Sequence, residues 1–161
     1  MSIKTLNLKY LWKRLTLTGG PYARRLPDYS DTFGVCMAKE HGRLPNDEFV
    51  PTVDFSTPPE EEFQKAIDAG LEALFRGQHV YAGCMGGIGR TGFYIACILK
   101  ILEPNVDPLL NVRARFKSHA VETTPQEQFV MNFDTSKYTR WYLFWLAVRT
   151  SNFRLGFTKR S

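Results

Sequence analysis

Cys84 and Arg90 stand five residues apart and are followed directly by Thr91; the residues between them are Met85, Gly86, Gly87, Ile88 and Gly89. This spacing puts a thiol nucleophile and a planar guanidinium on one short loop. The glycines let backbone N–H groups turn towards an anion, and a guanidinium fork matches two oxygens of a phosphoryl group. The loop therefore predicts phosphate binding, with Cys84 as the nucleophile.

The flanking segments favour the same chemistry. A short apolar strand is expected over residues 79–82, and an almost wholly apolar helix is expected over residues 91–102. The N-terminus of that helix carries a partial positive charge beside the loop. Cationic surroundings favour the thiolate form of a cysteine, and the Thr91 hydroxyl can donate a hydrogen bond to it.

Two nucleotide-binding patterns share part of this segment. Residues 87–92 match the dinucleotide fingerprint, but that fingerprint needs an acidic residue about 20 positions further on. Only Glu103 and Asp107 are near, in a turn at the wrong distance. The ATP-type phosphate loop needs Lys before Ser or Thr, and Arg90 occupies that place.

The stretch from His79 to Gly92 resembles the signature of the cysteine-dependent protein tyrosine phosphatases, in particular their compact dual-specificity branch. The resemblance implies an α/β fold with a central, mostly parallel sheet and helices on both faces. It implies Cys84, Arg90 and Thr91 as catalytic residues, residues 85–90 as the phosphate-binding loop, and no metal or other cofactor. Gly83 departs from the family pattern, which usually has histidine there.

Two further catalytic positions follow from chemistry and from this resemblance. The leaving oxygen needs a proton donor, and a carboxylic acid on a loop before the cysteine is the expected device. Asp54, in the sequence Asp-Phe-Ser-Thr-Pro, fits that loop, with Asp47 and Glu48 as fallbacks. Gln126 falls where the family presents a glutamine that orients the hydrolytic water.

The other cysteines have simpler readings. Residues 35–41 resemble the strand end from which the lipid-phosphatase branch presents a second cysteine, which makes Cys36 a candidate redox partner of Cys84. The alternative is that Cys36 is a small core residue, as we expect for Cys97. Three cysteines in all is an odd and sparse number that favours a reducing, cytoplasmic setting over a disulfide framework.

Length and charge limit the remaining possibilities. A chain of 161 residues predicts a single phosphatase domain over 1–161, with a core at about 15–133 and an aromatic helix at about 136–149. No apolar run is long enough to span a membrane. The net charge of +5 comes mainly from the two ends, where residues 1–27 and 135–161 contain no acidic residue. The aromatic run at 141–145 is expected to pack in the core, with an exposed partner face as the alternative.

These observations predict hydrolysis of phosphomonoesters through a cysteinyl-phosphate intermediate. A phosphorylated protein is the favoured substrate, because residues 85–89 contain no lysine of the kind that phosphoinositide phosphatases usually place there. An RNA 5′-end or phosphoinositide phosphatase is the alternative on the same scaffold. Nucleic acid is thus a second, less favoured partner. The missing histidine at Gly83 also leaves open a catalytically weak phosphate-binding module.

Overall fold

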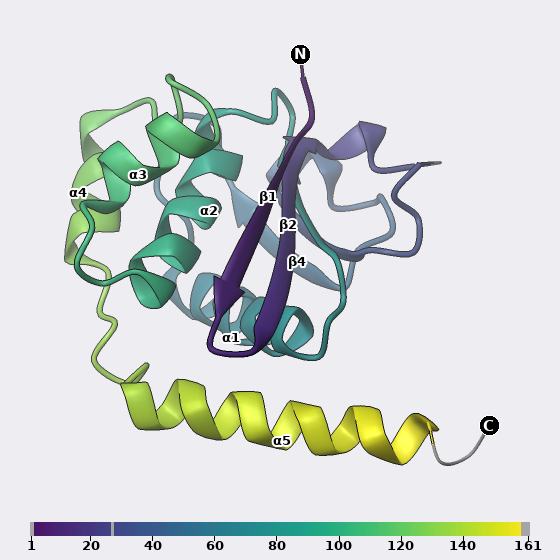
Figure 1. The fold of residues 1–161 in the computed structure, drawn as a ribbon. Coiled ribbons are helices and arrows are strands. Elements are labelled where there is room, and N and C mark those ends of the chain that lie inside the picture. The colour runs from purple at the N-terminus through teal and green to yellow at the C-terminus, as the bar shows by residue number, and fades with distance from the viewer. Residues whose placement is uncertain (1, 27, 159–161) are drawn as a thin grey trace.

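A computed structural model describes residues 2–26 and 28–158 of this chain; in the last helix it describes side chains as far as Ser151. Strands and helices alternate through the first two thirds, and helices alone follow (Figure 1). In chain order the elements are β1 (Lys4–Tyr10), β2 (Lys13–Pro21), the 3₁₀ helix η1 (Tyr22–Arg24), β3 (Phe33–Ala38), the 3₁₀ helix η2 (Lys39–His41), β4 (Glu48–Thr52), α1 (Glu60–Phe75), β5 (Val80–Cys84), α2 (Gly89–Leu102), α3 (Pro108–Arg115), α4 (Thr124–Asn132) and α5 (Arg140–Thr158).

The sheet has five strands in the order β1-β2-β5-β3-β4. Strands β2, β5, β3 and β4 are parallel, and β1 pairs with β2 in the antiparallel direction. Because parallel strands end at the same edge, Pro21, Ala38, Thr52 and Cys84 all lie towards one edge of the sheet. The predicted mostly parallel α/β fold is confirmed.

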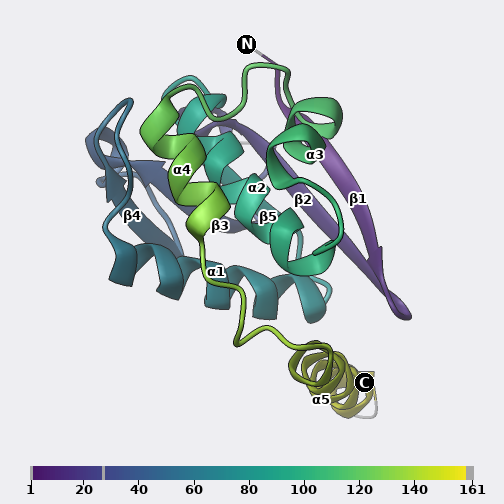
Figure 2. The ribbon, with the colours of Figure 1, turned by 90° about the vertical axis from the view of Figure 1, so that its left-hand side faces the viewer.

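One face of the sheet is covered by α1 and α2, which also pack on each other. The Tyr94 hydroxyl of α2 donates to the Ala66 carbonyl of α1 at 2.8 Å, and the rings of Phe63 and Phe93 lie 5.1 Å apart. A Cβ at Gly19 of β2 would collide with Ile95 of α2, so β2 runs close beneath that helix. Figure 2 shows α3 and α4 beside α2 on this side.

The opposite face is covered by the 3₁₀ helix η1 and the loop after it, with the rings of Tyr22 and Tyr29 lying 6.3 and 5.1 Å from that of Tyr81. The second layer is thus a 3₁₀ turn and a loop. His79 and Tyr81 share this face, as strand alternation predicts: the His79 ring contacts Tyr29, and its Nε2 lies 2.6 Å from the Thr18 hydroxyl.

Two elements differ from the sequence-based expectation. Strand β1 was not predicted, although Leu6 and Leu8 alternate as a half-buried strand requires. The turn that joins it to β2 contains neither glycine nor asparagine, which hid the hairpin. Among the residues of α5 whose side chains are described, only Leu143, Leu146, Ala147 and Thr150 are buried. Trp141, Tyr142, Phe144 and Trp145 are all exposed, so the expected core packing of the aromatic run is wrong for its four rings.

None of the helices within the described residues combines the length and apolar character needed to cross a membrane.

Candidate active site

The candidate site lies where β5 ends and α2 begins. Cys84 is the last residue of β5, Gly89 is the first of α2, and four loop residues connect them. Cys84 is buried, whereas Met85 next to it is exposed. The fold therefore sets the thiol just below the surface at the carboxyl edge of the sheet, where parallel α/β folds commonly bind ligands.

The Cys84 sulfur receives two hydrogen bonds from its own loop. The backbone N–H of Gly87 donates to Sγ at 3.2 Å, and the Thr91 hydroxyl donates to it at 3.1 Å. Both donors favour a negatively charged sulfur. The N-terminal turn of α2 adds its positive end at the same place.

The loop keeps its shape because it is wedged against the end of β2. Gly87 has a φ of +70°, and a Cβ there would lie 2.2 Å from the Gly20 carbonyl carbon and 2.3 Å from the Pro21 nitrogen. From the other side, Lys117 Nζ donates to the Gly87 carbonyl at 2.8 Å. Burial lowers the pKa of Lys117, and the nearby charge of Cys84 opposes that shift.

The same close packing explains why position 83 holds glycine. A Cβ on Gly83 would lie 2.7 Å from the Gly20 carbonyl oxygen and 2.8 Å from the Cα of Tyr22. Both contacts are with backbone, so any side chain at this position would push β5 away from β2. A histidine is excluded here by space. Lys117, which donates to the Gly87 carbonyl, is a cation close enough to Cys84 for its charge to matter.

Arg90 is a buried cation of the site that several groups hold in place. Its side chain is 2% exposed, and its NH1 and NH2 groups donate to the two carboxylate oxygens of Glu40 at 2.9 and 2.6 Å. NH1 also donates to the Thr52 carbonyl at 2.9 Å. A guanidinium has five N–H donors, so these bonds leave the edge formed by Nε and the second NH2 proton. Nε is buried and, among the described residues, has no hydrogen-bond acceptor.

Glu40 was missed by the sequence reasoning. It lies in η2, directly after β3, so its place at the carboxyl end of a central parallel strand was the available signal. The hydrogen bonds from Arg90 lower the pKa of Glu40 from 4.5 to about 2. The stabilisation of the fold by this ion pair is therefore fully present above the ordinary pKa of 4.5, and it is lost only as the pH falls towards about 2. The pair holds throughout pH 5–8.

Asp54 is the carboxylate that the structure brings to Arg90. Its Oδ1 lies 3.4 Å from Arg90 Nε, and its side chain is half-exposed on the loop after β4. The two fallback residues lie elsewhere. Asp47 accepts a hydrogen bond from the backbone N–H of Gly34 at 2.7 Å, and Glu48 faces Lys65 of α1 at 4.0 Å.

Gln126 lies beside the loop of Asp54. Its side-chain oxygen accepts from the backbone N–H groups of Glu122 and Thr123, which completes the capping box of α4. Its amide nitrogen donates to the Ser56 carbonyl at 3.0 Å. That bond links α4 to the loop that carries Asp54. It uses one of the two amide protons of Gln126, so one donor remains.

Cys36 lies on the neighbouring strand. It pairs with Gly83 in the β3–β5 register, and its thiol contacts the Ala38 carbonyl at 3.6 Å. Strand alternation directs Cys36 and Cys84 to opposite faces. Burial raises the pKa of the Cys36 thiol to about 11. Cys97 is buried inside α2, as expected for a core residue, and burial raises its pKa as well.

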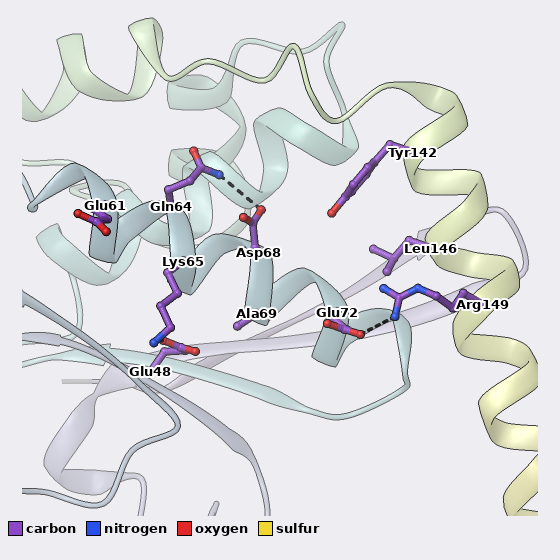
Figure 3. A pocket seen from close by; sticks show the side chains of 10 residues that line it. All are labelled: Glu48, Glu61, Gln64, Lys65, Asp68, Ala69, Glu72, Tyr142, Leu146 and Arg149. Carbon is purple, nitrogen blue, oxygen red and sulfur yellow. Dashed lines mark hydrogen bonds and ion pairs between the residues drawn. The ribbon is translucent and has the colours of Figure 1, made fainter.

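A separate cavity of about 600 Å³ lies between α1 and α5 (Figure 3). Its lining includes four carboxylates, from Glu48, Glu61, Asp68 and Glu72, against the two cations Lys65 and Arg149. Arg149 donates to Glu72 across it at 2.9 Å. This excess of negative charge disfavours a phosphate, so the cavity is distinct from the site at Cys84.

Comparisons with known proteins agree with this geometry. Residues 44–102 match the family model described as "Polymorphic toxin system, DSP-PTPase phosphatase". Among solved structures, Tk-PTP in its active form superposes with a TM-score of 0.60 at 24% identity, covering 80% of this chain and 96% of that one. The chain has the fold of the compact dual-specificity phosphatases. The expected resemblance is thereby confirmed.

Other matches extend the comparison. Kinase associated phosphatase, with its catalytic-site cysteine replaced by serine, gives a TM-score of 0.63 at 17% identity over 82% of this chain and 93% of that one. PTPMT1 in complex with PI(5)P gives 0.56 at 17% identity over 83% and 93%. Two uncharacterized proteins of Methanocaldococcus jannaschii, MJECL20 and MJ0215, are 35% and 33% identical over 85 residues, which is 53% of this chain. The chain spans 57% and 53% of the length of these two relatives.

The Glu40–Arg90 pair yields a prediction for this phosphatase-like site. Glu40→Gln keeps the size of the side chain but removes the charge that fixes the guanidinium, so kcat for p-nitrophenyl phosphate should fall about 10-fold with little change in KM. Glu72→Gln is the matched control, because Glu72 pairs with Arg76 and Arg149 away from Cys84. Equal kcat values for the two variants would contradict a positioning role for Glu40.

Proposed function

We propose that this protein hydrolyses phosphate monoesters through a phosphocysteine at Cys84. The observation that carries the proposal is the pairing of a sulfur that accepts two hydrogen bonds with a buried guanidinium edge whose Nε makes no hydrogen bond within the described residues and faces Asp54 at 3.4 Å. An equatorial pair of phosphate oxygens fits that edge of Arg90. The backbone amides of residues 85–89 would hold the remaining charge.

The reaction balances with the residues of this site. The Cys84 thiolate forms a bond to phosphorus as the bond from phosphorus to the ester oxygen breaks, and Asp54 gives its proton to that oxygen. Water then attacks phosphorus, the sulfur–phosphorus bond breaks, and the water proton passes to the Asp54 carboxylate. Thr91 stabilises the departing thiolate through its hydroxyl. Gln126 is proposed to orient the water with its remaining amide proton.

The substrate proposed is a phosphorylated protein side chain, with phosphotyrosine favoured. Met85, beside the nucleophile, and Phe55, beside the proposed acid, are exposed apolar side chains at the rim of the site. They suit a phenyl ring better than a polyhydroxylated inositol ring. The binding of PI(5)P by PTPMT1 makes a phosphoinositide the alternative substrate.

Replacing the nucleophile tests the reaction. Cys84→Ser should abolish turnover of p-nitrophenyl phosphate, while inorganic phosphate still binds to the loop. Cys97→Ala is the control, because it removes a buried thiol from the interior of α2 and should keep the activity. Undiminished turnover by Cys84→Ser would refute the proposal. A thiolate mechanism also predicts that EDTA leaves the rate unchanged.

The general acid can be tested through the leaving group. Asp54→Asn should slow an alkyl or simple phenyl phosphate by about 10²–10⁴-fold, and should slow a very acidic phenol much less, since that phenol leaves without a proton. Asp47→Asn is the comparison, because Asp47 holds the backbone of Gly34 instead of facing Arg90. An equal loss of rate for all leaving groups would show that Asp54 is not the general acid.

The substrate class can be tested by comparing several classes of phosphomonoester. Phosphotyrosyl, phosphoseryl and phosphothreonyl peptides, a 5′-phosphorylated RNA and soluble phosphoinositides should be compared by kcat/KM. We expect the phosphotyrosyl peptide to lead, and its advantage should shrink in Phe55→Ser and Met85→Ser. A phosphoinositide or the RNA as the best substrate would overturn the assignment of the substrate while leaving the chemistry at Cys84 intact.

Cys36 is proposed as a redox partner on the strength of its position. Its strand β3 pairs with β5, and Cys36 lies opposite Gly83, the residue before Cys84. Because strand alternation directs the two thiols to opposite faces, the disulfide requires the backbone around Cys84 to move. Peroxide would oxidise the Cys84 thiolate to a sulfenic acid, and attack by Cys36 would form the disulfide and release water. Because the pKa of Cys36 is raised to about 11, cross-linking should quicken with rising pH. Peptide mapping that finds only sulfinic acid at Cys84 would exclude this role.

A further inference from the structure

The turn between β1 and β2 is built from residues that turns rarely use. Tyr10 pairs with Lys13, so Leu11 and Trp12 alone form the two-residue connection. Leu11 has a φ of +54°, a conformation that two-residue hairpin turns normally give to Asn, Asp or Gly. Both side chains are about half exposed, 48% for Leu11 and 52% for Trp12. The backbone is therefore strained where two large apolar side chains are exposed to solvent. Strain that is kept at such a place indicates a function.

Helix α5 has a second apolar face whose tryptophans stay exposed in the described structure. Its inner face packs towards α1 through Leu143, Leu146 and Ala147. On the opposite side Trp141 is 77% exposed and Trp145 is 68% exposed. A helix that is apolar on both sides is ordinarily buried on both, so the outer face of α5 is suited to a partner.

The hairpin tip and α5 form one surface. The rings of Trp12 and Phe144 meet edge to face with centroids 6.0 Å apart, and Trp141 meets Phe144 in the same way at 6.0 Å. The indole N–H of Trp12 donates to the Ser151 hydroxyl at 3.0 Å. Figure 1 shows the tip of the hairpin beside α5. We call this surface the aromatic patch: Leu11, Trp12, Trp141, Phe144 and Trp145.

Basic side chains flank the aromatic patch at the hairpin tip and at the start of α5, and on the α1 side of α5 the carboxylates of Asp68 and Glu72 are paired with Lys137 and Arg149. Lys9 and Arg14 are exposed and sit directly opposite each other on β1 and β2, close to the tip, and Arg140 is exposed at the start of α5. Like charges placed opposite one another in a hairpin are destabilising, unless an anion lies against them. The two sequence ends that supply the patch, residues 1–27 and 135–161, hold 12 of the 21 basic residues and none of the 16 acidic ones.

We propose that the aromatic patch docks this protein on the surface of an anionic lipid bilayer. Tryptophan, phenylalanine and leucine side chains beside exposed lysine and arginine are the chemistry that binds the boundary between lipid headgroups and acyl chains. A second copy of this chain fits less well, because a two-fold contact places the same basic surface on both sides. Single-stranded nucleic acid would use the same charge and stack on the same rings, and the RNA titration below distinguishes it from the bilayer.

Docking in this way would fix the orientation of the candidate active site. Lys13, next to the tip, and Pro21, which pairs with Cys84, are the two ends of β2. A strand of this length spans about 26 Å, so the Cys84 loop lies at the far end of the sheet from the aromatic patch. The site would then face the aqueous side, open to a phosphorylated protein and not to a headgroup of the same membrane.

Tryptophan emission gives a direct readout, because all three tryptophans of the chain belong to the aromatic patch. The full chain should be titrated with vesicles of phosphatidylcholine containing 30% phosphatidylserine, and with vesicles of phosphatidylcholine alone. We expect a blue shift in emission and co-sedimentation with the anionic vesicles only. Trp141→Ser with Trp145→Ser, and separately Lys9→Glu with Arg14→Glu, should each weaken sedimentation about 10-fold or more.

The controls separate docking from other causes. Leu110→Ser removes an equally exposed apolar side chain from α3 and should bind vesicles as the wild type does. Hydrolysis of p-nitrophenyl phosphate should be unchanged in all these variants, which shows that they fold and keeps this test independent of the catalytic proposal. No sedimentation of the wild-type chain would overturn the proposal. A dimer of the wild-type chain in light scattering, which becomes a monomer in the tryptophan variants, would also overturn it. So would binding of single-stranded RNA that shifts the emission more strongly than the vesicles do.

Discussion

The contact between the Cys84 loop and the end of β2 is the constraint on which the site depends. Gly87 can lie against Gly20 and Pro21 only because it lacks a Cβ and adopts a positive φ. That contact directs the Gly87 N–H at the Cys84 sulfur. The same closeness leaves no space for a side chain at Gly83. One packing requirement therefore sets the shape of the loop, one donor to the sulfur and the identity of the residue before the nucleophile.

Burying the Arg90 guanidinium requires compensation, and the protein supplies it from two other strand ends. Glu40 follows β3 and the Thr52 carbonyl ends β4, and together they engage one edge of the fork. A buried charge without partners would be costly. Because the compensation is confined to that edge, the edge towards Asp54 remains for a ligand. The parallel arrangement of β3, β4 and β5 is what brings these groups together, since it ends all three strands at one side of the sheet.

The aromatic patch is built differently from the candidate active site. The Cys84 loop is held by close contacts and hydrogen bonds, whereas the β1–β2 tip and α5 leave large apolar side chains in water. Exposing them is unfavourable by the hydrophobic effect, and the positive φ of Leu11 adds strain. Both unfavourable contributions are offset when the surface is covered by the bilayer. The two regions lie at opposite ends of β2, so attachment at one end leaves the other free.

From sequence alone, the phosphate-binding loop could be predicted, and so could the elements with strong periodicity. The Cys84 to Thr91 spacing, the apolar α2 and the amphipathic α1 were readable because glycine placement and helical repeat are local properties. Asp54 could be named from its loop, but only the structure separated it from Asp47 and Glu48, by placing it next to Arg90. Tertiary structure alone supplied Glu40 and Lys117, the β1–β2 hairpin with its unusual turn, and the outward side of α5. These depend on which strand ends meet and which helix face finds a partner, and such long-range contacts are not encoded in local residue patterns.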